Sequence, residues 1–249
     1  MAIPRTLLSC LLAFVSLLVP GSALAEFSLG AGASVETSPY KNYPAQWMPL
    51  PIVSYEGDYA YIRGMSAGIK AVDLEFLEVS AYAAYNNMSF QHHESSDQQL
   101  RLLKDRDASI IGGIGTRLKT PAGMFHLAAA VDLMNNSNGL TGEAGYVYSF
   151  DFGTVELLPA AGVHWSNANY TTYYYGVSSK EAQTSGLDSY KAKQSFSPYI
   201  GLTLNVTLNE NWEIFLQGEV TQLDRQIKDS PMVGSSRTNA ASTGIVFTF

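Results

Sequence analysis

Apolar and polar residues alternate with a period of two in segment after segment of this chain. In the segment 196–208, the even positions carry Phe196, Ile200 and Leu204, whereas the odd positions are mostly Ser, Thr and Asn. Successive side chains of a strand point to opposite faces, so this pattern predicts strands with one apolar and one polar face. Twelve strands are predicted, with ten as the alternative because two of them are short. The predicted strands are 27–36, 49–56, 58–64, 66–73, 77–87, 109–119, 125–133, 140–150, 155–165, 196–208, 212–223 and 242–249.

The connections between these segments fall into two length classes. The tight, turn-rich class is 56–58, 73–75, 120–122, 151–153 and 209–211, and the long class is 37–48, 88–107, 167–194 and 224–239. Short turns at one end and long loops at the other are typical of outer-membrane barrels. Alternation alone also fits a soluble sandwich, but a sandwich has no reason to sort its loops. We therefore expect an all-β, antiparallel transmembrane β-barrel with short periplasmic turns, long extracellular loops and both termini periplasmic.

The last eight residues, 242–249, alternate in the same way and end on an aromatic residue. Phe249, Phe247 and Ile245 share one face of the predicted strand. A barrel needs its last strand to close against its first, because an unpaired edge is costly in lipid. The pattern resembles the signal by which the barrel assembly machinery recognises its clients. The alternative is an ordinary C-terminal edge strand.

The first 25 residues are predicted to be a cleaved signal peptide. Arg5 precedes the apolar run 6–19, which is too short for a membrane span, and Ala23 and Ala25 supply a small-x-small cleavage site. Glu26 then begins the mature chain, and residues 26–249 are expected to form one barrel domain. The chain's one cysteine lies inside this leader, so no disulfide is expected in the mature protein.

Composition limits the classes of partner. Removing Arg5 with the leader leaves 14 basic against 22 acidic residues, a net charge of −8. This excess of acid argues against nucleic acid as a partner, because phosphates require basic patches. Only 15% of residues are charged while 12% are aromatic, which suits a surface that faces lipid and lipopolysaccharide.

The polar faces of the predicted strands place charged residues in the barrel lumen, among them Glu156, His164 and Arg117. A hydrolase would need a serine within hydrogen-bond reach of a lumenal histidine, and no nucleophile motif is present. Lumenal ion pairing is the better interpretation, and the acidic excess would favour cations if a path is open. We expect no catalytic residue, no cofactor and no enzymatic activity.

Two loop motifs leave alternatives open. His92, His93 and Glu94 could bind a divalent metal, but adjacent histidines lack helical spacing and a solvated polar loop fits them better, so no metal site is predicted. The tyrosine cluster Tyr170–Tyr175, which includes Tyr173 and Tyr174, either folds into the barrel mouth or forms an exposed surface for a partner or glycan. The first alternative is favoured because exposed tyrosine runs on a cell surface would be costly.

Several motifs resemble those of the MipA/OmpV family of outer-membrane proteins, and the resemblance covers most of the chain. The tyrosine-rich stretch is the most specific of them. The residues that carry the resemblance are Asn169-Tyr170, Tyr173-Tyr174-Tyr175-Gly176-Val177, Ser185-Gly186-Leu187, Tyr190, Ser197-Pro198 and Asp229-Ser230-Pro231-Met232-Val233, with Leu50-Pro51, Tyr55-Glu56-Gly57, Tyr61, Arg63-Gly64 and the stretch 105–109 earlier in the chain.

The resemblance implies a Gram-negative outer-membrane protein without defined catalytic residues. Some family members are scaffolds that bind a lytic transglycosylase and help to join it to a peptidoglycan synthase. Others are described as antigens, adhesins or proteins that affect permeability. A non-enzymatic scaffold for murein-remodelling enzymes is therefore expected, with a narrow channel of possible cation preference or a surface adhesin as alternatives.

Overall fold

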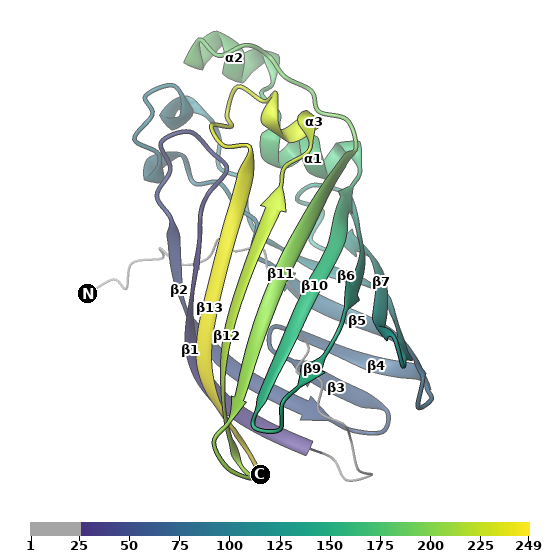
Figure 1. Ribbon diagram of the computed structural model, residues 1–249. Coiled ribbons are helices and arrows are strands. Elements are labelled where there is room, and N and C mark those ends of the chain that lie inside the picture. Colours follow the sequence, from purple (N-terminus) through teal and green to yellow (C-terminus); the bar gives the residue numbers. More distant parts are fainter. Residues whose placement is uncertain (1–25) are drawn as a thin grey trace, which may run out of the picture.

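Twelve antiparallel strands close into a barrel in the computed structural model, which describes residues 26–249 (Figure 1). The signal-peptide prediction for residues 1–25, with Ala23 and Ala25, falls outside the described residues. The strands of the barrel are β1 (Glu26–Glu36), β2 (Gln46–Glu56), β3 (Ala60–Arg63), β4 (Ser66–Asp73), β5 (Leu77–Asn86), β6 (Ser109–Thr120), β7 (Gly123–Asp132), β8 (Leu140–Val147), β10 (Val155–Ser166), β11 (Ser195–Thr207), β12 (Trp212–Gln222) and β13 (Arg237–Thr248).

Each of these strands pairs with its two neighbours, and β1 closes the ring against β13 with Leu29 opposite Phe247. A thirteenth strand, β9 (Phe150–Asp151), pairs only with β10. β9 extends β8 along the same side of β10. Val147 of β8 lies opposite Ala160, and Phe150 of β9 lies opposite Leu157, so the pairing register is unchanged between the two strands. The prediction of a twelve-stranded antiparallel barrel is confirmed, and the ten-strand alternative is wrong.

Two strand boundaries differ clearly from the sequence prediction. β2 begins at Gln46 rather than at position 49, and β13 begins at Arg237 rather than at position 242. The sequence pattern did not predict the first residues of β2 because Pro49 and Pro51 follow them, and proline is rare inside a sheet. In β13 the early residues are Arg, Thr, Asn and Ala, which carry no apolar alternation for the sequence pattern to detect.

The wall has a polar inner face and an apolar outer face. Ile114, Leu127 and Ile200 point outward and are 66%, 60% and 65% exposed, as suits side chains that meet lipid rather than water. The neighbouring residues in the strands point into the lumen, so the apolar core of a soluble protein is absent from the wall. A compact core lies instead among the loops at one end of the barrel.

The two ends of the barrel differ in the length of their connections. The turn end comprises 57–59, 74–76, 121–122, 148–154 and 208–211, beside the first residue of β1 and the last residue of the chain. The loop end comprises 37–45, 87–108, 133–139, 167–194 and 223–236, whereas the connection 64–65 is short. The sorting of turns and loops expected from the sequence is therefore present.

The loop end contains short helices: η1 (His92–Glu94), η2 (Leu100–Leu102), α1 (Ala168–Tyr175), α2 (Ser179–Ser185) and α3 (Arg225–Lys228). Side chains fix where α1 and α2 begin. Asn167 accepts a hydrogen bond from Tyr170 N, and Ser178 and Glu181 form a reciprocal capping box. Among residues 26–249, no helix is long and apolar enough to cross a membrane.

Candidate functional site

The loop end is closed by a set of packed loops that we call the cap. Its core includes Tyr174, Phe90, Leu100 and Met232, all of which are completely buried. These residues come from three separate loops, so the loops hold one another in place. The full buried core is Tyr40, Met88, Phe90, Leu100, Leu103, Tyr174, Tyr175, Val177, Leu223, Ile227, Met232 and Val233.

The tyrosines of α1 belong to this core rather than to an exposed surface. Tyr174 donates its hydroxyl hydrogen to Asp107 O at 3.1 Å, and the Tyr173 hydroxyl oxygen accepts from Asp107 N at 2.9 Å. Tyr175 packs against Tyr40, with ring centroids 5.8 Å apart. Burial raises the pKa of the Tyr174 hydroxyl, so it stays protonated. The geometry is that of the first alternative, in which the tyrosines fold into the barrel mouth, and Gly176 ends their helix.

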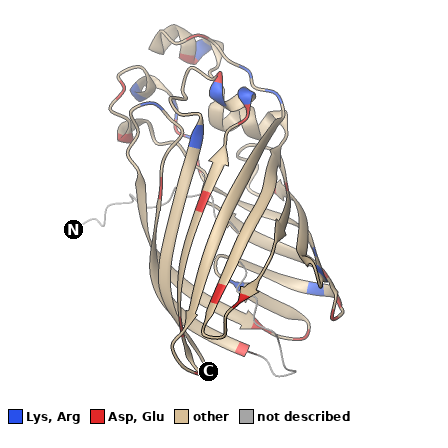
Figure 2. Cartoon of the chain, viewed as in Figure 1, with Lys and Arg blue, Asp and Glu red and all other residues tan. Residues whose placement is uncertain are grey.

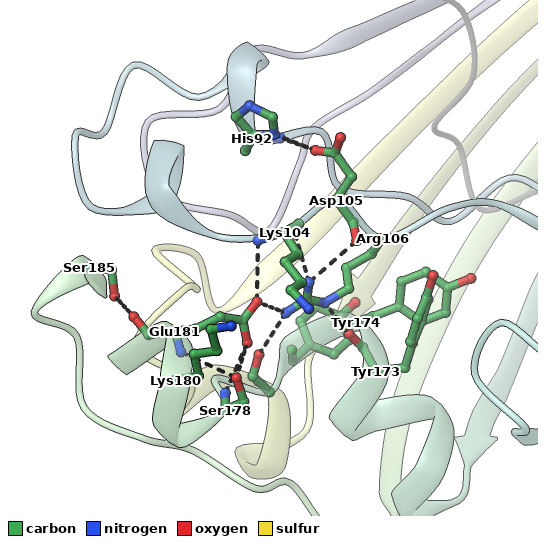
Figure 3. Close-up of polar contacts among 12 residues, drawn as sticks. His92, Lys104, Asp105, Arg106, Tyr173, Tyr174, Ser178, Lys180, Glu181 and Ser185 are labelled. Carbon is green, nitrogen blue, oxygen red and sulfur yellow. Dashed lines mark hydrogen bonds and ion pairs between the residues drawn. The ribbon is translucent and has the colours of Figure 1, made fainter. Parts of the chain in front are cut away.

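A buried ion pair fastens two loops of the cap (Figure 3). Arg106 Nη2 lies 2.8 Å from Glu181 Oε1, and its Nε donates to Tyr173 O at 2.7 Å. Glu181 also accepts hydrogen bonds from Lys104 N, from Ser178 N and from the Ser178 hydroxyl. Burial opposes ionisation of Glu181, but the hydrogen bonds from Arg106 and Ser178 outweigh it and lower the pKa of this carboxyl to about 2. The pair therefore stays charged across the physiological range.

The lumen contains two groups of charged side chains. In the first, the Arg63 guanidinium binds both carboxylates beside it: it donates to Glu78 at 2.9 and 2.8 Å and also bonds Glu56 through two nitrogens. Lys70 Nζ lies 2.9 Å from Asp73 and 3.5 Å from Glu56. Arg63 also covers the ring of Tyr61, 3.8 Å from its centroid. We call these residues, with Arg117, the arginine group; Arg117 Nη1 lies 4.0 Å from Glu78.

The second group, which we call the histidine group, lies on β7 to β12. Tyr199 donates its hydroxyl hydrogen to Glu143 at 2.8 Å, and His126 Nε2 lies 3.1 Å from the same carboxylate oxygen. His164 stacks on the Tyr199 ring with centroids 4.5 Å apart, and its Nε2 lies 3.7 Å from Glu219. Carboxylates and ring nitrogens therefore satisfy one another along the wall, as lumenal pairing requires.

A glycine makes room for this group. A Cβ at Gly145 would lie 2.3 Å from His126 Cε1 and 2.5 Å from the Tyr199 hydroxyl oxygen. A side chain at this position would displace at least one of the two rings. The position of the two rings therefore depends on glycine in β8.

A cavity of about 260 Å³ lies between the two groups and the underside of the cap. Arg63, Arg117, His126 and His164 line it, and Tyr175 contributes from the cap. Its walls carry both signs of charge. Apolar side chains such as Ile111 and Trp165 line it as well. Among the contacts of residues 26–249, no serine is placed to attack through a histidine.

The structure distributes the sequence-predicted site residues over several places. Arg117 lies in the arginine group and His164 in the histidine group, whereas Glu156 lies towards the turn end, where Ser149 and Asn205 donate to it at 2.7 and 3.1 Å. All three face the lumen, but they do not form one site. The sequence did not predict the central roles of Arg63 and Tyr199. Arg63 lies in a strand of only four residues, and Tyr199 lies on the face of β11 that was described only as polar.

The metal-binding alternative considered for His92, His93 and Glu94 concerns the helix η1. His92 Nδ1 lies 2.7 Å from Asp105 Oδ1, and Glu94 accepts from the Gln46 side chain at 3.1 Å. The ring of His93 meets His92 edge to face, with centroids 5.8 Å apart. Within residues 26–249, no group of three His, Cys, Asp or Glu side chains is arranged to hold a metal ion.

The two ends differ in charge (Figure 2). The turn-end connections contain Asp58, Glu75, Asp151 and Glu210 and no Lys or Arg, and all four carboxylates are exposed. Large apolar side chains lie beside these carboxylates and are also exposed, and Tyr59 is 82% exposed. The loop-end connections carry both signs in nearly equal number, nine Lys or Arg against eight Asp or Glu. The basic residues there are Lys41, Arg101, Lys104, Arg106, Lys180, Lys191, Lys193, Arg225 and Lys228. The other exposed turn-end residues are Leu74, Phe76, Phe152, Leu208 and Phe249.

The predicted assembly residues lie where the barrel closes. Phe249 N donates to Phe27 O at 3.0 Å, and the two rings are 5.6 Å apart. Phe247 packs edge to face on Phe249, with centroids 4.8 Å apart, and Ile245 pairs with Ala31. These contacts seat the last residues of the chain on the first strand. Their recognition by assembly machinery stays a prediction.

A closed barrel with an apolar outer wall, a charged lumen and capped loops defines an outer-membrane β-barrel protein. The chain belongs to the family described as MltA-interacting protein MipA, which matches residues 29–249. The resemblance inferred from the tyrosine-rich motif is thereby confirmed, as is the outer-membrane class.

Curated relatives cover almost the whole chain. The MltA-interacting protein of Escherichia coli (strain K12) is 35% identical over 224 residues, 90% of each chain. The outer membrane protein YiaT of the same organism is 32% identical and covers 90% of this chain and 91% of its own. The outer membrane protein OmpV of Vibrio cholerae serotype O1 is 23% identical, with 90% and 87% covered. Among solved structures, the NanC porin aligns over 90% of this chain and 99% of its own, with 9% identity and a TM-score of 0.43.

Proposed function

We propose that this protein is a non-enzymatic scaffold that holds a murein-remodelling enzyme at the outer membrane. The observation that carries the proposal is the turn end, where exposed carboxylates stand beside exposed aromatic rings. A relative at 35% identity is named for its interaction with MltA, a lytic transglycosylase. An enzyme of that kind, together with a peptidoglycan synthase, is the expected partner.

The proposal requires the turn end to face the periplasm. A cleaved leader at residues 1–25 would deliver Glu26 there, next to Phe249. Exposed lysines of the loop end, such as Lys191 and Lys193, would then lie near the phosphates of lipopolysaccharide. The mature chain 26–249 acts as one unit in this arrangement.

The turn end supports docking through charge and aromatic contact together. Tyr59 and Phe152 project beyond the strands, and large rings of this kind supply most of the binding energy in protein interfaces. Asp58, Glu75 and Asp151 would attract a basic partner surface and speed the encounter. The short turns provide a small surface, so a weak or transient complex is expected.

Binding of a purified MltA-type transglycosylase to the barrel in lipid nanodiscs tests this function. The variant D58N/E75Q/D151N/E210Q should lower affinity at least tenfold and weaken its salt dependence. The matched control D188N/E94Q alters loop-end carboxylates and should bind as the wild type does. Equal binding by all three proteins, or none by the wild type, would contradict the scaffold at this surface.

A narrow channel is the second candidate, and the charged lumen with its cavity favours it. The cap would then act as a gate. Removal of residues 171–193 should produce reproducible conductance steps in a planar bilayer, while the intact barrel conducts little. If both proteins are silent after heat-modifiable gel migration confirms folding, the channel is excluded.

A further inference from the structure

Two carboxylates of the lumenal wall lack a positive partner near the turn end. Glu156 is the second residue of β10 and Glu213 is the second residue of β12, and both side chains are partly buried. Within residues 26–249, neither carboxylate forms an ion pair, whereas Glu78 and Glu143 in the arginine and histidine groups do. Glu213 also accepts no hydrogen bond from a described residue. This part of the lumen therefore carries two negative charges without compensation.

An asparagine between the two carboxylates has a buried oxygen without a donor. Asn205 on β11 lies directly opposite Glu156, and it is the diagonal neighbour of Glu213, which pairs with Thr207. Asn205 is 3% exposed, its Nδ2 donates to Glu156 at 3.1 Å, and its Oδ1 accepts no hydrogen bond from a described residue. The two ends of an amide point apart, so Oδ1 is directed away from Glu156, towards the β12 side. A buried acceptor without a partner is destabilising, so Oδ1 requires a positive group that the described side chains do not supply.

The surroundings of these groups increase the cost of uncompensated charge. Phe215 and Val246, the neighbours of the site on β12 and β13, are 9% and 3% exposed. Glu213 is subject to the negative charges of Glu156 and Glu26, and no Lys or Arg of the described chain is among the charges that act on it. Like charges beside buried apolar side chains repel one another strongly, because little water screens them. A cation held between the carboxylates would remove this repulsion.

The available donor atoms are all oxygens, which selects the kind of cation. Carboxylate and amide oxygens are the ligands of hard cations such as Ca²⁺ and Mg²⁺, which complete their coordination with water. β10 and β12 are about 10 Å apart across β11, a span that two Glu side chains and a partly hydrated cation can bridge. Ser149, in the exposed connection 148–154, donates to Glu156 at 2.7 Å, so this carboxylate lies at the solvent-exposed turn end.

We propose that Glu156, Asn205 and Glu213 bind a partly hydrated divalent cation, Ca²⁺ or Mg²⁺, on the lumenal wall near the turn end. The bound cation joins β10, β11 and β12 through two carboxylates and the amide oxygen that has no donor. The site lies outside the cavity, whose lining includes none of these three residues. Cation binding does not depend on the scaffold function.

Calorimetric titration of the metal-free, refolded barrel in an uncharged detergent tests the proposal, with CaCl₂ and MgCl₂ in separate experiments and KCl at matched ionic strength. We expect saturable binding of one cation per barrel, with a Kd on the order of 0.1–1 mM. Glu213→Gln and Glu156→Gln each remove one charged ligand and should weaken binding by roughly tenfold or more. Asp188→Asn removes the same charge from an exposed loop position and should bind as the wild type does. Heat-modifiable migration confirms that each variant has folded, and Glu213→Gln is well suited because its side chain loses no hydrogen bond.

Thermal stability gives a second readout in which the variant and the wild type should differ in sign. The cation should raise the midpoint of heat-modifiable migration for the wild type but not for Glu213→Gln. In EDTA, Glu213→Gln should be the more stable of the two, because the repulsion between carboxylates is reduced. Saturable binding of only one of the two cations supports the proposal and identifies the ion. Absence of saturable binding, equal affinity of the wild type and Glu213→Gln, or an effect that KCl reproduces overturns it.

Discussion

Arg106 and Glu181 meet at 2.8 Å although 75 residues separate them, and each side chain is only 9% exposed. The pair joins the loop 87–108 to α2, and Arg106 also bonds the backbone of α1 at Tyr173. Three elements of the cap therefore depend on one guanidinium. Loss of one partner of such a pair leaves a buried charge without compensation.

Replacing Arg106 by Ala should open the cap without unfolding the barrel. The loss of a buried partner costs about 3–5 kcal/mol, which exceeds what a local core of loops can absorb. We expect rapid proteolytic cleavage within 167–194 while heat-modifiable migration is unchanged. Arg225→Ala removes an exposed pair with Asp229 and should leave cleavage at the wild-type rate. Equal resistance of the two variants would show that the pair does not hold the cap.

The cap should loosen in acid. Glu181 has a pKa of about 2, below its ordinary 4.5, so its contribution to stability is complete above about pH 4.5. That contribution is lost as the pH falls from 4.5 towards 2, where the carboxyl becomes protonated. Hydrogen exchange of the α2 amides, measured at pH 6 and pH 3, should be faster at the lower pH after correction for intrinsic rates. Glu181→Gln should abolish the difference.

Gly145→Ala should destabilise the histidine group. Its methyl group would overlap His126 and Tyr199, so at least one ring must move. We expect a lower midpoint of heat-modifiable migration, by several degrees. Gly115→Ala is the matched control, because it also faces the lumen and its Cβ would meet Ser80 Oγ at an ordinary 3.6 Å. A midpoint equal to that of the control would mean that the His126 and Tyr199 rings can move aside without lowering the stability of the barrel.

Arg63→Lys should weaken the barrel near the turn end. A guanidinium can bind two carboxylates at once, whereas an ammonium group cannot reproduce that fork. Glu56 and Glu78 would then share a poorer partner in a partly dry lumen. The urea midpoint of the refolded barrel should fall, while Arg101→Lys, at an exposed position of η2, should not change it. An unchanged midpoint in both would show that a single positive charge is sufficient.

Deleting Phe249 should impair assembly in cells more than folding in vitro. The ring packs against Phe27 and Phe247, but the pairing of β1 with β13 continues for nine residues without it. We expect a reduced amount of barrel in the outer membrane and near-normal refolding in detergent. Similar losses in both assays would assign Phe249 a structural role instead of an assembly signal.

The strand pattern was predictable because it depends on local periodicity and on the membrane around it. Alternation located every strand of the wall, and turn lengths gave the sorting of the two ends. Contacts between distant loops were not predictable. The position of Glu181 beside Arg106 depends on how α2 packs against the loop 87–108, and nothing in either segment encodes the other. The role of Arg63 was not predictable for a related reason, since its two carboxylate partners, Glu56 and Glu78, lie on β2 and β5.

The ring closes between the first and the last strand of the described chain, β1 and β13. Ser28 and Thr248, 220 positions apart in the sequence, share a hydrogen bond at 2.9 Å. No shorter piece of the polypeptide can satisfy both edges, so the barrel cannot begin to close until its final strand has been synthesised and delivered. Such non-local pairing makes folding slow, and the partly folded intermediates are prone to aggregate during that time. Until β13 reaches β1, the chain presents unpaired strand edges, which favour association with other chains.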